Sequence, residues 1–335
     1  MIVSAEASLD GRPIIWKHRD TSATNNFLSR VEPDGTGSLG YVALFNGGDD
    51  LRLDEAWLGM NDAGFCIMNT VAYNLPPNDP AWTDREGYVM AMALAECRTV
   101  DDFEHLLNRL PKPTGVRTCF GVLDASGAGA YFEADDYRFE RYNLSDAPQG
   151  VLIRTNYAYS GTPDEGMGYI RHRNVEELLA NEIKNGAITP ASLTEGLSRS
   201  FYNSQTGFDE AQSSMRWAID QDFIPRHSST ASIAIEGLLP DEDPSKMMMW
   251  ANLGYPPCSH VVAVQLNNIP EEAGPSLSEN GGVYSLMGLD ADELKALVFP
   301  LTRGSGQRYI DLDAVREISD EQFKISLEEY AKARK

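Results

Sequence analysis

Short apolar runs separated by polar turns dominate the start of the sequence. Residues 2–7 and 13–16 are strand-like, and the turn signal Asp10-Gly11 lies between them. Short apolar runs are typical of β-strands, and Asp-Gly is a common two-residue hairpin turn. The pattern therefore predicts an N-terminal β-hairpin that ends near Asp20.

Further strands are predicted wherever a short apolar run ends at a turn rich in Gly, Asn or Asp. The predicted ranges are 41–45, two strands within 57–73 around the turn at 61–64, 118–123, 130–133, 138–142, 151–154, 229–236, 246–251 and 261–266.

Helices are predicted in the segments rich in Leu, Ala and Met that lie between these strands. The predicted ranges are 85–97, 99–110, 168–185, 190–201, 290–298 and 320–333. Thr99 is expected to cap the second helix, with Asp101 and Asp102 in its first turn and Pro111 after its end.

The order of these elements is strands, helices, strands, helices, strands, helices, without a regular βαβ alternation. This order disfavours a doubly wound parallel sheet and favours an α+β fold of two antiparallel sheets covered by helices. The polar segments 76–80 and 270–282 do not separate two convincing domains. Residues 1–335 are therefore predicted to form a single domain, with residues 270–335 as a C-terminal extension packed on it.

Composition narrows the range of functions. A net charge of −22 argues against binding to nucleic acid and to anionic membrane surfaces, which a basic face would favour. No apolar run reaches the roughly 18 residues that a membrane-spanning helix needs. The four cysteines are far apart and form no C-x-x-C pair, so neither a zinc site nor a disulfide framework is expected. We expect no metal and no cofactor.

The glycines Gly35, Gly37 and Gly40 match the spacing of a dinucleotide-binding fingerprint. That fingerprint needs a strand before it and a helix after it. Here a polar stretch precedes the glycines and the strand-like residues 41–45 follow them. We interpret the segment as a flexible loop.

Several polar segments that interrupt or end strand-like runs carry the candidate chemistry. They are Lys17–Thr21, Gly59-Met60-Asn61 with Gly64, Arg154-Thr155-Asn156 and His227–Ser232. Asp10-Gly11-Arg12-Pro13, Phe120–Asp124 with Ala130–Glu133, and Gly254–Ser259 accompany them in the same order. Over roughly residues 1–266 the chain resembles the N-terminal-nucleophile hydrolases of the choloylglycine hydrolase, penicillin V acylase and acyl-coenzyme A:isopenicillin N acyltransferase-like type.

The resemblance implies a four-layer αββα sandwich with two stacked antiparallel sheets. It also implies hydrolysis of linear amide bonds, or acyl transfer, on a small amide or acylated substrate. The nucleophile is an N-terminal cysteine, and its own α-amino group serves as the base. An α-amino group with an ordinary pKa near ~8 can accept the thiol proton near neutral pH.

The resemblance also assigns roles. Asp20 would orient the amine of the nucleophile, Asn69 would donate to the oxyanion, and Asn156 would complete the site. Arg226 would act on the centre electrostatically, and Lys17 stands near a position that is often basic. For each residue a local structural role is the alternative: an ion pair for the charged side chains, and a capping or strand-end hydrogen bond for the two amides.

Aromatic side chains could line an acyl pocket. The candidates are Trp57, Tyr73, Trp82 and Tyr157, with core packing as the alternative role for most of them. Tyr73 also competes with Asn69 as the oxyanion donor.

The expected cysteine is absent from the first residues, which are Met1, Ile2, Val3, Ser4 and Ala5. A gap-free count back from Asp20 places Met1 where the cysteine is expected, and a longer hairpin would place it about three residues earlier. Ser4 could serve only if the three residues before it were removed.

Three explanations for the missing cysteine stay open. The chain starts at an internal methionine after a lost Cys-containing segment, it is a pseudoenzyme that binds without cleaving, or it uses different chemistry. An acidic α/β protein unrelated to this family remains a further alternative. A secretion signal is absent from these residues, and a lost segment would leave localisation open. The sequence does not decide whether the protein forms a homo-oligomer.

Overall fold

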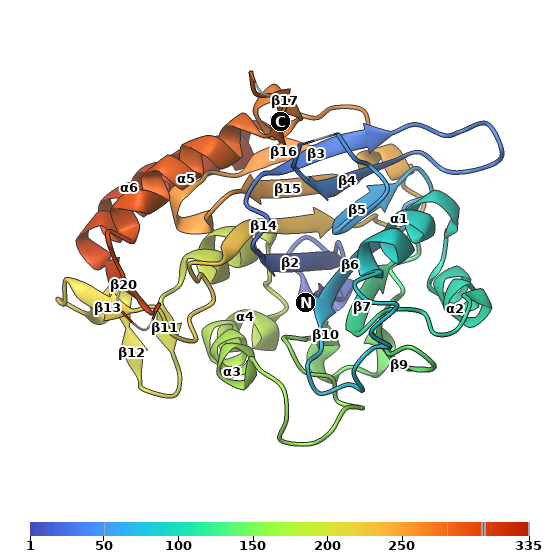
Figure 1. Ribbon diagram of the computed structural model, residues 1–335, viewed down its shortest axis with the longest axis horizontal. Coiled ribbons are helices and arrows are strands. Elements are labelled where there is room, and N and C mark those ends of the chain that lie inside the picture. The colour runs from blue at the N-terminus through green and yellow to red at the C-terminus, as the bar shows by residue number, and fades with distance from the viewer. Residues whose placement is uncertain (50, 280, 303, 305, 334–335) are drawn as a thin grey trace.

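A computed structural model describes residues 1–49, 51–279, 281–302, 304 and 306–333 (Figure 1). Its larger sheet has seven antiparallel strands that follow one another in chain order. These strands are β3 (Asn26–Val31), β4 (Tyr41–Asn46), β5 (Leu58–Asn61), β6 (Cys66–Val71), β7 (Thr118–Leu123), β8 (Gly129–Ala134) and β9 (Phe139–Asn143).

The second sheet has six antiparallel strands in the order β10-β1-β2-β14-β15-β16. Its strands are β1 (Ile2–Val3), β2 (Ile14–Asp20), β10 (Val151–Leu152), β14 (Ser229–Glu236), β15 (Met248–Leu253) and β16 (Val262–Val264). The predicted hairpin is confirmed, because β1 pairs with β2 and β2 ends at Asp20. The first strand is shorter than predicted, since residues 5–7 form a 3₁₀ turn.

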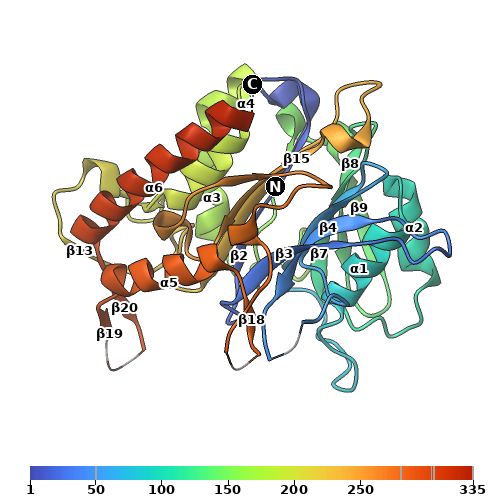
Figure 2. The same ribbon diagram turned by 90° about the horizontal axis from the view of Figure 1, so that it is seen from above.

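The two sheets stack face to face around a shared apolar core (Figure 2). Ile15 and Ile233 of the smaller sheet belong to this core together with Leu44, Met60 and Met68 of the larger sheet. Helices cover both outer faces, so the layers run αββα. The predicted α+β fold is confirmed.

Helices α1 (Glu86–Glu96) and α2 (Val100–Arg109) cover the larger sheet. Thr99 caps α2 as predicted: its side chain accepts a hydrogen bond from the Asp102 N–H, and Asp102 accepts one from the Thr99 N–H. This reciprocal capping satisfies backbone donors that the first helical turn would otherwise leave free.

Helices α3 (Tyr169–Leu178), α4 (Ala180–Asn185), α5 (Leu286–Val298) and α6 (Leu312–Ala333) lie on the opposite side of the molecule. Helix α6 packs its Tyr330 ring on Trp250 of β15, with ring centroids 4.3 Å apart. The Ser326 hydroxyl of α6 also accepts a hydrogen bond from the Val261 N–H. The C-terminal helix therefore covers the edge of the smaller sheet.

Short two- to four-residue strands complete the structure. They are β11 (Tyr202–Asn203), β12 (Phe208–Asp209), β13 (Trp217–Ile219), β17 (Ser276–Leu277), β18 (Val283–Tyr284), β19 (Leu301–Thr302) and β20 (Arg308–Asp311). In the part of the chain that the structure describes, no helix combines the length and the apolar character that crossing a membrane requires.

Two expectations about elements are wrong, and a third is met in an unexpected form. Strand β3 lies in a segment expected to be a polar stretch, because Asn26 at its start is buried and hydrogen-bonded rather than solvated. The helical segment expected at 190–201 is present, but as a π-helical turn followed by a 3₁₀ turn. Helix α6 starts eight residues before the expected 320, because the Asp311 carboxylate accepts the N–H of Asp313.

Phe103 lies in the apolar layer between the larger sheet and helices α1 and α2, and its replacement tests how much this layer contributes to stability. Its ring packs edge-to-face on Phe120 at 5.4 Å and on Phe132 at 5.2 Å, and its side chain is fully buried. Replacing Phe103 with Ala should lower the free energy of unfolding by about 3–5 kcal/mol, because it removes apolar contact and leaves a cavity. Urea unfolding measures this. Phe323→Ala, at a position 39% exposed on α6, is the control and should cost less than about 1 kcal/mol.

Candidate functional site

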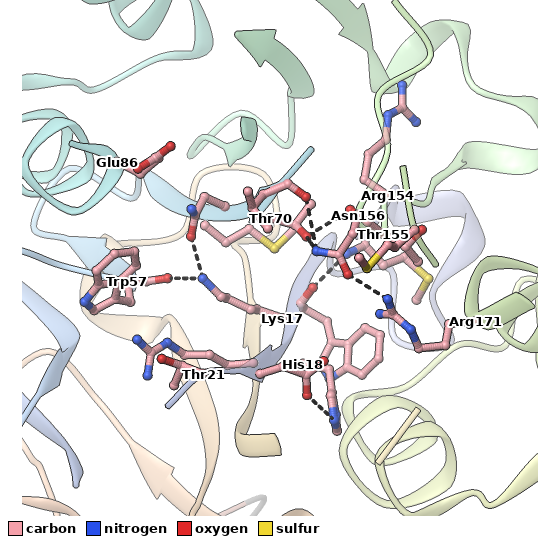
Figure 3. A pocket seen from close by; sticks show the side chains of 18 of the residues that line it. Lys17, His18, Thr21, Trp57, Thr70, Glu86, Arg154, Thr155, Asn156 and Arg171 are labelled. Carbon is pink, nitrogen blue, oxygen red and sulfur yellow. Dashed lines mark hydrogen bonds and ion pairs between the residues drawn. The ribbon is translucent and has the colours of Figure 1, made fainter. Parts of the chain in front are cut away.

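A cavity of about 550 Å³ opens where β1 begins and β2 ends (Figure 3). Its walls come from β2, β6, the segment after β10, helix α3 and the loop before β14. Among the described residues, no group of three or more His, Cys, Asp and Glu side chains could hold a metal ion.

Most of the side chains predicted for the site meet at this cavity. Those that line it are Lys17, Asp20, Trp57, Asn69, Tyr73, Asn156 and Arg226. Tyr157 lies outside the lining. Its ring stacks on Tyr169 with centroids 4.1 Å apart, and its hydroxyl is 2.9 Å from Nδ1 of His172.

Asp20 is held at the end of β2 by a local irregularity in the pairing with β14. The register shifts between Ser229 and Ala231, which leaves Ser229 opposite Asp20. The Asp20 carboxylate accepts a hydrogen bond of 2.6 Å from the Ser229 hydroxyl and forms an ion pair with Arg226. Burial acts to raise the pKa of Asp20, but the positive charge of Arg226 and its other neighbours outweigh burial and lower it. Asp20 is therefore ionised.

The hydrogen bonds around Ser229 fix the tautomer of His18. The hydroxyl of Ser229 gives its one hydrogen to Asp20 and accepts the Arg226 backbone N–H at 2.9 Å. Nε2 of His18, 2.8 Å from the same oxygen, must therefore be the donor of that pair. Nδ1 of His18 is then an unprotonated acceptor, and it is buried without a hydrogen-bond partner among the described residues.

Lys17 lies on the side of β2 that faces the larger sheet. Its Nζ donates to the Trp57 carbonyl oxygen at 2.7 Å and to Oδ1 of Asn69 at 2.6 Å. Nδ2 of Asn69 donates to the Thr118 hydroxyl at 3.3 Å. Asn69 therefore presents its carbonyl oxygen to Lys17, while its amide nitrogen is directed at Thr118. Burial, with the charge of Arg19 adding to it, lowers the pKa of Lys17 well below its ordinary value.

Asn156 connects the C-terminal end of β6 to helix α3. Its Nδ2 donates to the Val71 carbonyl oxygen at 3.1 Å, and its Oδ1 accepts from Arg171 at 2.7 Å. The backbone oxygen of Asn156 accepts the N–H of Tyr73 at 3.1 Å, while the Tyr73 side chain is 43% exposed. Asn156 is thus fixed at both ends of its amide.

A buried ion pair anchors the segment that carries Asn156. Nε of Arg154 donates to Oε1 of Glu133 at 2.6 Å, with both side chains almost fully buried. Glu133 also accepts the backbone N–H groups of Tyr159 and Ser160. Since each charge has a partner, the pair can be buried at the floor of the site without an uncompensated charge.

The sequence analysis gave no role to His18 or to Arg171, although both line the cavity. His18 follows Lys17 and shares a face of β2 with Asp20, which period-2 alternation could have indicated. A cationic run such as Arg171-His172-Arg173 predicts a solvated helix face, and that prediction is wrong for its first two members. Arg171 lines the cavity and His172 is 7% exposed, because this turn of α3 packs against the site. Only Arg173 is solvated, with its side chain 67% exposed.

Met1 lines the cavity at the start of β1. Its nitrogen donates to the Trp16 carbonyl oxygen at 2.7 Å, and the Trp16 N–H donates back to the Met1 oxygen at 2.8 Å. Burial, followed by the charges of Arg154 and Lys17, lowers the pKa of the Met1 α-amino group to about 4. This amine is therefore unprotonated at neutral pH.

The four cysteines lie away from the cavity. Cys66, Cys97, Cys119 and Cys258 are all buried, and none is among the lining residues. Burial raises the pKa of each thiol, which disfavours the reactive thiolate. They act as small apolar residues of the core.

No family model matches the sequence, and no curated protein matches it. The structure is similar to a mutant of conjugated bile acid hydrolase from Clostridium perfringens, with 11% identity over 79% of this chain and 92% of that one and a TM-score of 0.46. It is also similar to penicillin V acylase from Agrobacterium tumefaciens, with 13% identity, 80% and 86% coverage and a TM-score of 0.41.

A third similar structure is the Caenorhabditis elegans ortholog of N-acylethanolamine-hydrolyzing acid amidase. It shares 12% identity over 72% of this chain and 93% of that one, with a TM-score of 0.43. At identities and TM-scores this low, the function has to be argued from the geometry of the cavity.

His18 should make the protein sensitive to acid. Burial lowers its pKa to about 4 from an ordinary 6.5, so between these pH values the unfolded chain binds a proton that the folded chain does not. The free energy of unfolding should therefore fall as the pH is lowered through this window, by up to about 3 kcal/mol. The measurement is urea unfolding of the wild type and of His18→Gln, whose amide can still donate to Ser229. As the pH falls through this window, the free energy of unfolding should decrease more in the wild type than in the variant.

His105, exposed on α2, provides the matched control. An exposed imidazole is solvated alike in both states, so His105→Gln should follow the wild-type pH dependence. A His18→Gln variant with the wild-type pH dependence would contradict the buried neutral imidazole.

Proposed function

We propose that the cavity is the reaction centre of a linear-amide hydrolase of the N-terminal-nucleophile type, with the attacking group at the position of Met1. The observation that carries the proposal is the convergence of Asp20, Asn69, Asn156 and Arg226 on the cavity where β1 begins. The αββα layers of the structure, which the family resemblance also implies, support the proposal. Small amides or acylated amines are the substrates that this architecture suits.

The proposed reaction needs a side-chain nucleophile beside a free α-amine. The amine takes the nucleophile's proton, the nucleophile adds to the amide carbonyl, and the carbonyl oxygen becomes an oxyanion. The leaving amine then departs with the proton, and water cleaves the acyl intermediate to give a carboxylic acid. Cationic donors that line the cavity, here Arg171 and Arg226, stabilise the developing negative charge.

Asp20 and Asn156 have positioning roles in this proposal. Asp20 places a fixed negative charge at the end of β2, and its ion pair with Arg226 keeps that charge in place. Asn156 holds Arg171 at the cavity through a 2.7 Å hydrogen bond. Trp57 contributes an aromatic wall for the acyl group.

Met1 favours a second candidate, a binding protein that holds amides without cleaving them. Its thioether has no proton to lose, and no cysteine among the described residues lines the cavity. In this form the cavity would bind the substrate of the hydrolase and release it unchanged. The two candidates share one site and differ in a single side chain.

Replacing Met1 with Cys tests whether the cavity supports hydrolysis once a nucleophile is present. A Met1→Cys protein with the new cysteine as its first residue, released from a cleavable fusion, should hydrolyse amides that the parent only binds. On a panel of N-acyl p-nitroanilides of increasing acyl length, kcat/KM should rise at least about a hundredfold over the parent, since a nucleophile contributes far more than this in acyl-transfer enzymes. Release of p-nitroaniline and mass detection of an acyl-cysteine intermediate measure the effect.

Met1→Ala, prepared through the same fusion, is the matched control and should stay inactive. Combining Met1→Cys with Asp20→Asn should remove most of the gained activity if Asp20 orients the reacting group. A folded Met1→Cys protein that binds panel amides but forms no acyl-enzyme would reject the hydrolase and leave the binding protein. Absence of both binding and turnover would reject the cavity as an amide site.

A further inference from the structure

Lys17 is a partly buried amine that forms no ion pair at the cavity. No carboxylate of the described residues lies within 4.0 Å of its Nζ, although Asp20, Asp84 and Glu86 line the same cavity. Its two hydrogen-bond partners, the Trp57 carbonyl oxygen and Oδ1 of Asn69, are both uncharged. An ammonium group in this place would therefore lose hydration without an ion pair, which is costly. The charge of Glu86 and the Trp57 ring, 5.9 Å from Nζ, favour the ammonium but do not outweigh burial, which lowers the pKa of Lys17.

The hydrogen bonds of Lys17 fit a neutral amine. A neutral amine has two hydrogens and one lone pair, whereas an ammonium group has three hydrogens. The acceptors at 2.7 Å and 2.6 Å take both hydrogens of a neutral amine and leave the lone pair over. Because burial also lowers the pKa of Lys17 well below its ordinary value, the amine is a ready nucleophile near neutral pH.

We propose that Lys17 is a nucleophilic amine that forms an imine with an aldehyde or ketone carrying a carboxylate. Nζ adds to the carbonyl carbon, and one amine hydrogen moves to the carbonyl oxygen to give a carbinolamine. The C–O bond then breaks, and the oxygen leaves as water with both hydrogens that Nζ carried. A C=N bond to Lys17 results, and no oxidant or metal is required.

We expect the ligand to carry a carboxylate because Arg171 is available to bind one. It lines the cavity, its hydrogen-bond partner Asn156 is uncharged, and no carboxylate of the described residues is within 4.0 Å of it. Its Nε is buried and has no hydrogen-bond acceptor in the described part of the chain. Figure 3 shows Arg171 and Trp57 on opposite sides of Lys17, so a ligand bound at Lys17 can extend towards Arg171. An anionic group there would satisfy both the charge and the open donor.

The test is covalent capture on the intact protein. The protein is incubated with 4-formylbenzoate and sodium cyanoborohydride, which reduces an imine to a stable amine, and the modified residue is identified by peptide mass mapping. At about neutral pH, Lys17 should be modified at least ~10-fold faster than exposed lysines, which are almost entirely protonated there. Its rate should also change little up to about pH 9, whereas the rates of exposed lysines should rise steeply.

Lys295 is the matched control within the same chain. It is 7% exposed but does not line the cavity, so burial alone would label it as well as Lys17. Lys17→Arg should abolish the fast labelling, with circular dichroism confirming that the variant is folded. Slow labelling of Lys17 at neutral pH, or equal labelling of Lys295, would overturn the nucleophilic amine.

The carboxylate is tested separately with benzaldehyde. Lys17 should react several-fold faster with 4-formylbenzoate than with benzaldehyde, after correction for their rates with a free model amine. Arg171→Gln should remove that preference, because it should slow the reaction with 4-formylbenzoate far more than the reaction with benzaldehyde. Equal corrected rates in the wild type would overturn the anion site. Neither result depends on amide hydrolysis, so the outcome is independent of the proposed hydrolase.

Discussion

The burial of charge at the end of β2 is the constraint on which the candidate site depends. Four consecutive titratable residues, Lys17, His18, Arg19 and Asp20, end a strand that lies between a β-sheet layer and a helical layer. Each would be costly to bury alone. The structure compensates each one differently: Asp20 with an ion pair, Arg19 with the amide oxygens of two asparagines, Lys17 with two neutral acceptors, and His18 by remaining neutral.

Alternation along the strand sorts these four side chains into two environments. Lys17 and Arg19 point towards the larger sheet, where their partners are uncharged oxygens of Trp57, Asn69 and two other asparagines. His18 and Asp20 point to the other face, where His18 is hydrogen-bonded to Ser229 and Asp20 to Arg226. Successive strand residues face opposite ways. One short strand therefore places two different groups at the cavity: the amine of Lys17, which has no ion-pair partner, and the carboxylate of Asp20, which is paired with Arg226.

Sequence patterns predicted the layers and most of the meeting residues, because strand ends and turns carry recognisable signals. The hairpin and the Thr99 cap follow from local patterns, whereas Asp20, Asn69 and Asn156 were predicted from the family resemblance. The role of Arg171 did not, because a cationic run on a helix predicts a solvated face unless the packing of that turn is known. The direction of the Asn69 amide could not be predicted either, because it is set by Lys17 and Thr118, which lie 52 and 49 positions away in the sequence.

The contrast between an acidic protein and a cationic cavity follows from the range of electrostatic forces. The chain carries a net charge of −22, yet Arg19 and Arg171 line the cavity without ion-pair partners among the described residues. Charges on the solvated surface are screened within about 8 Å at physiological ionic strength, whereas buried charges are screened much less. The local donors therefore decide what binds. An anionic ligand can be held inside a molecule that repels anions at long range, and its affinity should depend more on Arg171 than on bulk salt.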